Sequence, residues 1–249
     1  MQLRLHPQLQ PVLRLGIVLG EYTPPSAPFT SREDVVWAGA SGESVAVELM
    51  APDSAPRAQA LAEALVQAEG DAREAYDRVQ ALHEVADVAL VRRMLHECGI
   101  DPTRDRASSE ALLRRVLKGA GLPRINSLVD TNNLSSLELL LPIGIYDAFR
   151  LVGEGVARFG RTGETLEAIG RRTLDMEGVL TLADGLGPFG SPLSDSVRTM
   201  VRPETTRVLS VLFIPRDLSP HLAEARTQHA AHRLEELAGV QLTDTRVVS

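Results

Sequence analysis

Cysteine and aromatic residues are scarce in this chain of 249 residues, and each shortage excludes a class of function. The one cysteine, Cys98, cannot form an internal disulfide or build a thiolate metal site. We interpret it as a small buried hydrophobic residue, because no thiol motif surrounds it. Aromatic residues make up only 4% of the sequence, so recognition of single-stranded nucleic acid by stacking on rings is not expected.

Long apolar runs are also missing. The strongest one, from Val208 to Ile214, is far shorter than the roughly 20 residues that span a bilayer. Charged residues and prolines, among them Arg4 and Pro7, interrupt the N-terminal stretch. With 44% hydrophobic and 24% charged residues, we expect one soluble cytoplasmic domain spanning residues 1–249, with no membrane partner.

The formal net charge of −7 argues against indiscriminate binding of nucleic acid, and DNA is not an expected partner. The charge is unevenly spread: residues 60–90 carry two basic and seven acidic side chains, whereas residues 92–124 carry eight basic and four acidic ones. The second segment is either a local basic patch for RNA or a solvated helix face with internal ion pairs. The candidate RNA-binding residues are Arg114, Arg115, Lys118 and Arg124.

Helices and strands alternate irregularly, which favours the α+β fold class. Strands are predicted at residues 12–22, 34–40, 44–50, 156–159, 179–184 and 205–214. Helices are predicted from residue 56 to residue 98 with a division near Gly70, after a Ser108 N-cap, from residue 127 to residue 140, and from Ser219-Pro220 to about Ala238.

Two motif matches carry little weight. Gly185, Gly187 and Gly190 fit G-x-G-x-x-G, but prolines follow them where a helix would have to receive a pyrophosphate. His229 and His232 are three residues apart in the last predicted helix, without a third metal ligand nearby. We therefore expect neither a cofactor nor a metal.

The helix after Arg124 carries polar side chains in the middle of its apolar face. At 100° per residue, one narrow stripe of this helix contains four residues, which are Asn126, Asp130, Asn133 and Leu137. A buried polar group without a partner costs roughly 1–3 kcal/mol, so these groups must be hydrogen-bonded if buried. They either tie the helix to loop backbone or line a polar pocket.

The stretch GIDPTRDRASSEALLRRVLKGAGLPRINSLVDTNNLSSLELLLPIGIYD, residues 99–147, resembles the core of the B3/4 domain of the phenylalanyl-tRNA synthetase beta subunit. The resemblance continues through DGLGPFG and TTRVLSVLF and covers about residues 92–239. Residues 1–91 are similar in outline to the N-terminal strand and helix extension of free-standing relatives. The resemblance implies a mixed, largely antiparallel sheet or partial barrel with flanking helices.

In the synthetase this domain is an editing site that hydrolyses tyrosine wrongly esterified to the phenylalanine tRNA. Such a second sieve is useful because an apolar pocket rejects an added hydroxyl only weakly. Asn132 and Asn133 fall where the synthetase has a threonine-asparagine pair, Gly144 where it has a histidine, and Val211 where it has a glutamate that recognises the tyrosine hydroxyl. Without that glutamate, a preference for tyrosine has no basis at Val211.

The resemblance thus implies a tRNA-associated module that binds an aminoacyl ester or an amino acid and, if active, acts as an aminoacyl-tRNA deacylase. The alternative is a non-catalytic protein that binds RNA or a small ligand with the same fold. We find no ATP-binding domain of a complete synthetase. The candidate ligand-binding residues are Asn126, Asp130, Asn132, Asn133, Gly144, Gly187, Gly190 and Val211.

Overall fold

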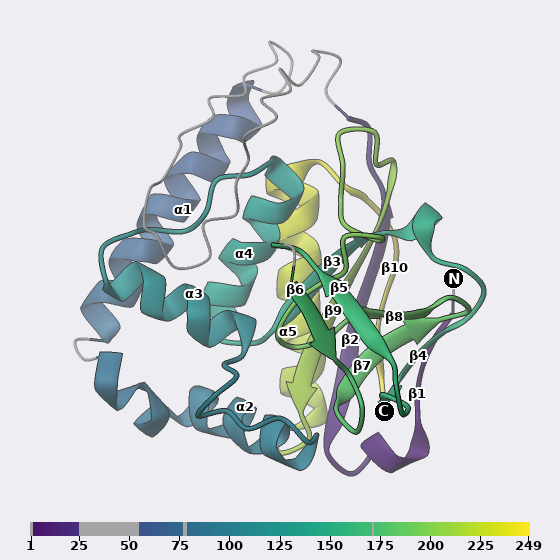
Figure 1. Ribbon diagram of the computed structural model, residues 1–249. Coiled ribbons are helices and arrows are strands. Elements are labelled where there is room, and N and C mark those ends of the chain that lie inside the picture. The colour runs from purple at the N-terminus through teal and green to yellow at the C-terminus, as the bar shows by residue number, and fades with distance from the viewer. Residues whose placement is uncertain (1, 25–54, 77–78, 171) are drawn as a thin grey trace.

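A computed structural model describes residues 2–24, 55–76, 79–170 and 172–249 (Figure 1). The strands predicted at 34–40 and 44–50 lie outside the described residues. The helices are α1 (Ala55–Ala75), α2 (Ala86–Glu97), α3 (Ser108–Leu117), α4 (Ser127–Leu139) and α5 (Pro220–Arg233), with short turns η1 (Pro7–Leu9), η3 (Val79–Glu84), η4 (Ala148–Arg150) and η5 (Leu234–Ala238). The strands are β1 (Leu3–Leu5), β2 (Leu13–Glu21), β3 (Ile143–Asp147), β4 (Gly155–Phe159), β5 (Thr165–Ala168), β6 (Arg172–Asp175), β7 (Leu180–Asp184), β8 (Gly187–Gly190), β9 (Arg207–Pro215) and β10 (Gln241–Val248).

The strands form two four-stranded sheets and a small hairpin. Sheet A has the order β1-β4-β7-β8, sheet B has the order β10-β2-β9-β3, and β5 pairs with β6. Every pair is antiparallel except β1 with β4, which is parallel. The prediction of an α+β fold with a mixed, largely antiparallel sheet and flanking helices is confirmed; the described strands do not close into a barrel.

Sheet B is covered on both faces. Its central strands β2 and β9 are apolar and almost entirely buried. Helices α4 and α5 pack on one face, and sheet A lies on the other, so that the helices and the two sheets form successive layers (Figure 1). Gly16 in β2 permits the close approach of α5, because a Cβ atom there would lie within 3.0 Å of the Thr227 hydroxyl oxygen.

The helices α1, α3 and α4 enclose a second apolar core away from the sheets (Figure 1). The predicted division at Gly70 is wrong: α1 runs through this exposed glycine, whose conformational cost of about 1 kcal/mol is offset by the apolar residues that α1 buries. The predicted continuous helix up to residue 98 is also wrong, because η3 precedes α2. Ser108 begins α3, and Ala107 is its N-cap.

The other predicted elements within the described residues correspond to elements of the structure. The predicted strands at 12–22, 156–159, 179–184 and 205–214 correspond to β2, β4, β7 and β9. Ser219 caps α5 by accepting a hydrogen bond from Leu222 N, and Pro220 takes the first helical position. Cys98 is fully buried, and burial raises the pKa of its thiol to about 12, which confirms its structural interpretation. Within the described residues, no helix is long and apolar enough to cross a membrane.

Candidate functional site

The two faces of sheet B divide the predicted ligand residues into two groups. Gly144 in β3 is directly opposite Val211 in β9, so both project toward sheet A. The neighbouring Ser210 projects to the other face, where its hydroxyl lies 3.1 Å from Oδ1 of Asn132 in α4. The residues of α4 and the residues between the sheets therefore belong to different sides of sheet B.

Between the sheets, the space beside Gly144 is occupied by the ring of Tyr146. Tyr146 is fully buried and shares the face of β3 with Gly144, two residues before it. Its ring meets the ring of Phe189 edge to face, with centroids 5.0 Å apart and planes at 87°. The phenol hydroxyl donates a hydrogen bond of 2.6 Å to Oδ1 of Asp195. The ring thus joins β3 to β8 and to the loop that follows β8.

Two glycines make room for this ring. A Cβ atom on Gly144 or on Gly190 would lie within 3.0 Å of the Tyr146 hydroxyl oxygen, a separation that real Cβ atoms essentially never show. An isolated antiparallel bridge pairs Asp195 with Gly190 and so holds the Asp195 carboxyl group beside the same ring. We call Gly144, Tyr146, Gly190, Asp195 and Val211 the inter-sheet site. Three members of this site were predicted from the sequence: Gly144, Gly190 and Val211. The Tyr146 phenol lies against both glycines, and Val211 is paired with Gly144.

The electrostatics of the inter-sheet site keep the Tyr146 phenol protonated and bring the pKa of the Asp195 carboxyl close to neutral pH. Burial raises the pKa of Asp195 to about 7, against the opposing effect of the Tyr146 hydrogen bond. Burial, together with the neighbouring Asp195 carboxylate, raises the pKa of Tyr146 well above its ordinary value. Asp195 is partly exposed as a whole residue, but its carboxyl group is buried beside the Tyr146 hydroxyl. A carboxyl with such a pKa can gain or lose a proton near neutral pH.

Gly187, the remaining predicted glycine, lies at the turn end of β8. It pairs with Asp184 in β7 and adopts a positive φ of 113°. A Cβ atom on it would meet nothing within 4 Å, in contrast to Gly190. Gly187 therefore serves the turn between β7 and β8 by its conformation, whereas Gly190 serves the inter-sheet site by its lack of a side chain.

At the start of α4, Asn126 and Asp130 tie the helix to its own N-terminal loop. Asn126 is the N-cap and accepts a hydrogen bond of 2.9 Å from Val129 N. The carboxylate of Asp130 accepts one of 2.7 Å from Ile125 N. Burial raises the pKa of Asp130 to about 6, opposed by that hydrogen bond and by the charge of Arg124.

The two asparagines that follow differ in their surroundings. Asn132 is buried, donates a hydrogen bond of 2.9 Å to the Ile143 carbonyl oxygen and accepts one from the Ser210 hydroxyl, so its amide joins α4 to β3 and β9. Asn133 is half-buried, and its amide forms no hydrogen bond with any residue that the structure describes. Of the pair, Asn132 is therefore tied to the sheet by its amide, and a ligand role for Asn133 stays a prediction.

The basic segment contains many internal ion pairs. Arg114 and Arg92 both bind the buried carboxylate of Glu110, at 2.7 and 2.8 Å. Arg124 lies 3.5 Å from Glu69. The guanidinium of Arg115 donates to the Gly121 carbonyl oxygen at 2.8 Å. Lys118 is exposed at the end of α3. Of the two alternatives for this segment, internal ion pairs apply to Arg114 and Arg124. Lys118 is the candidate RNA-binding residue whose charge is exposed to solvent.

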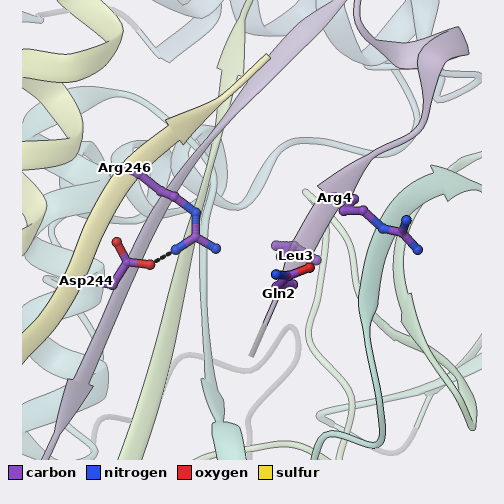
Figure 2. Close-up of a pocket in the computed structure, with 5 residues that line it drawn as sticks. All are labelled: Gln2, Leu3, Arg4, Asp244 and Arg246. Carbon is purple, nitrogen blue, oxygen red and sulfur yellow. Dashed lines mark ion pairs between the residues drawn. The ribbon is translucent and has the colours of Figure 1, made fainter.

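A separate hollow of about 380 Å³ lies between the edge strands β1 and β10. Gln2, Leu3, Arg4, Asp244 and Arg246 line it (Figure 2). Arg246 is ion-paired with Asp244, and Arg4 points away from both toward Glu154, its own ion-pair partner. The hollow contains none of the predicted site residues.

Sequence reasoning missed Tyr146 and Asp195. A signal for Tyr146 existed, because a residue two positions after Gly144 on a strand shares its face. Asp195 gave no such signal, since it lies 49 residues from Tyr146 in a loop of irregular conformation. By the resemblance, position 211 is that of a glutamate acceptor; in this chain Val211 is apolar, and the acceptor in the same site is the carboxyl group of Asp195.

Comparison of the sequence with known proteins identifies its family. The profile of the B3/4 domain matches residues 90–239, which is more than half of the chain. The chain belongs to the B3/4 domain family. It is 32% identical over 112 residues to the phenylalanine-tRNA ligase beta subunit of Neisseria meningitidis serogroup B, covering 41% of this chain and 14% of that protein. It is 38% identical over 94 residues to the corresponding subunit of Streptomyces avermitilis, covering 37% of this chain and 11% of that protein.

The B3/4 chain thus spans only about a seventh of the length of the relative from Neisseria. Among solved structures, an N-terminal fragment of the phenylalanyl-tRNA synthetase beta subunit from Pyrococcus horikoshii matches with a TM-score of 0.37 and 16% identity. That match covers 48% of this chain and 43% of the fragment.

Proposed function

We propose that this B3/4 protein is a tRNA-associated module that binds the amino-acid part of an aminoacyl ester, or a free amino acid, at its inter-sheet site. The family and the relatives, which are subunits of a tRNA ligase, support an association with tRNA. The single observation that carries the proposal is the convergence of Gly144, Gly190 and Asp195 on one ring-sized space. A space shaped to one amino-acid side chain, with a carboxyl acceptor for its hydroxyl, suits an amino-acid ligand.

Hydrolysis of the ester is the second candidate, and Asp195 favours it. A carboxylate with a pKa of about 7 in the site could take a proton from the water that attacks the ester carbonyl. The bond between the carbonyl carbon and the ribose oxygen would then break, releasing the amino acid and leaving the tRNA hydroxyl protonated. An aminoacyl ester is already activated, so positioning and one proton acceptor could be sufficient.

The decisive experiment combines tRNA retention with deacylation. Purified protein is mixed with a panel of aminoacyl-tRNAs that carry small, apolar and aromatic amino acids, and both filter retention and loss of the ester are followed. Binding is expected for at least one member. The absence of retention and of deacylation for the whole panel, with protein shown to be folded, would reject the proposed function.

Asp195→Asn separates binding from hydrolysis. If Asp195 is the proton acceptor, the variant should retain the tRNA but lose deacylation by about 10²- to 10⁴-fold, the range typical of general bases. Asp217→Asn is the matched control, because Asp217 is an exposed carboxylate paired with Arg93 on the surface. Equal loss in both variants would exclude a specific role for Asp195.

A further inference from the structure

The ring of Tyr146 leaves little of the inter-sheet space for a ligand's side chain. Its hydroxyl is hydrogen-bonded to the buried carboxyl of Asp195, and the hydroxyl end of the ring fills the volume above both glycines. Gly144 occupies the position at which the synthetase, by the sequence resemblance, has its pocket histidine. A side chain at position 144 and the seated Tyr146 ring exclude each other, because a Cβ atom there would overlap the phenol oxygen.

The contacts of Tyr146 hold the ring firmly. Burial of an aromatic ring and its edge-to-face contact with Phe189 contribute stability, and the hydrogen bond to a carboxylate is of the stronger, charge-assisted kind. Displacing the ring would leave the Asp195 carboxyl without its phenol donor. A ligand that cannot replace these contacts would have to bind beside the ring.

We propose that Tyr146 determines specificity by acting as a built-in occupant of the inter-sheet site, which closes the site to aromatic side chains of a ligand. Asp195 is the residue that holds this occupant in place. The proposal rests on the proposed function, since it takes the inter-sheet site as the place where the amino-acid part binds. It predicts that removing the ring opens a space matched in shape to a phenol and equipped with an acceptor for its hydroxyl.

The test uses 4-methylphenol and toluene as probes, with the full chain. Wild-type protein should bind neither, while Tyr146→Ala should bind 4-methylphenol at least about tenfold more tightly than the wild type does, as apolar cavities of this kind accept aromatic probes. Tyr146→Ala should also prefer 4-methylphenol over toluene by about tenfold, because only the phenol can donate to Asp195. The preference should vanish in Tyr146→Ala with Asp195→Ala.

Two outcomes would overturn the proposal: equal binding of 4-methylphenol to wild-type and Tyr146→Ala protein, or no binding of either probe to the folded variant. If Tyr146→Ala does not fold alone, 4-methylphenol should restore a cooperative unfolding transition, because a ligand that binds only the folded state stabilises it. If Tyr146→Ala does not fold even with 4-methylphenol present, the same probes are compared on Tyr146→Leu, which keeps more apolar contact. These readouts need no RNA, so their failure is distinct from a failure of tRNA retention or deacylation.

Discussion

The hydroxyl oxygen of Tyr146 lies within 3.0 Å of the point that a Cβ atom on Gly144 would occupy. The two residues share one face of β3, so the tyrosine reaches back over the glycine. Gly144 is therefore required by the ring beside it rather than by its backbone conformation, since it is absent from the glycines with positive φ. The identity of position 144 and the identity of position 146 are physically coupled.

Gly144→Ala should destabilise the protein by about 1–3 kcal/mol, because the added methyl group overlaps the phenol. In a Tyr146→Leu background the same change should cost less, which gives a coupling energy of about 0.5–3 kcal/mol in a double-mutant cycle. Urea unfolding of the four proteins measures it. Gly70→Ala is the control, since it lies in the exposed part of α1 with no atom near its Cβ position, and it should stabilise by about 0.5–1 kcal/mol. Additive effects at 144 and 146 would contradict the coupling.

Tyr146→Phe should cost about 1–3 kcal/mol of unfolding free energy, although the ring and its contact with Phe189 are kept. The cost arises because the Asp195 carboxyl loses the phenol that donates to it. Tyr22→Phe is a matched control: the Tyr22 hydroxyl lies 3.1 Å from the Ser127 hydroxyl in a partly buried pair of uncharged groups, and its loss should cost less. Equal costs in chemical denaturation would mean that the carboxyl partner adds nothing.

The raised pKa of Asp195 predicts that stability falls as pH rises from about 4 to about 7. In this window the folded state holds a proton on Asp195 that the unfolded state has released, so raising the pH favours unfolding; above about 7 the effect levels off. Asp195→Asn should remove this part of the pH dependence. Asp130, with a pKa of about 6, contributes in the same direction and persists in the variant. The unfolding free energy of Asp195→Asn relative to the wild type should therefore rise as pH increases from about 4 to about 7, because asparagine resembles the protonated carboxyl; parallel curves would refute the assignment.

The main strands and helices could be predicted because their signals are local. Ser219 and Pro220 mark the start of α5, and the apolar run from Val208 to Ile214 is the centre of β9. Three-residue β1 and the late strand β10 were missed, since such edge strands are defined by their pairing partners more than by their own pattern. Gly70 misled the prediction because tertiary burial of the rest of α1 outweighs one glycine.

The candidate site was only partly predictable for the same reason. Gly144, Gly190 and Val211 entered through a resemblance, and the structure brings them together between the sheets. The polar stripe of α4 was visible as a period, but a period cannot say which sheet face a helix covers. The contact between Tyr146 and Asp195 depends on the packing of sheet A against sheet B, which no local pattern encodes.

RNA binding, if it occurs through α3, should be modest and strongly salt-sensitive. Arg114 is paired with Glu110, so few side chains remain to contact phosphates, and two or three such contacts predict that affinity falls roughly 10- to 40-fold between about 50 and 200 mM salt. Lys118→Glu should weaken filter retention of tRNA, whereas Arg114→Ala should mainly lower stability, because it leaves the buried Glu110 with one partner fewer. An absence of retention at both salt concentrations would reject RNA binding altogether.

The adjacent residues Asn132 and Asn133 should respond in opposite ways to substitution by alanine. Asn132 satisfies the Ile143 carbonyl oxygen and the Ser210 hydroxyl in the core, so Asn132→Ala should cost about 1–3 kcal/mol. Asn133 has no hydrogen-bond partner among the described residues, so Asn133→Ala should leave the melting temperature nearly unchanged. If Asn133 contacts a ligand, this variant should instead weaken retention or deacylation of the aminoacyl-tRNA.

Asp130→Asn serves as a second structural control, because Asp130 binds Ile125 N one turn away. Thermal unfolding of the three variants, measured beside the retention assay, separates the two roles. A large loss of stability in Asn133→Ala with unchanged retention would assign Asn133 to the scaffold and limit the ligand site to the space between the sheets.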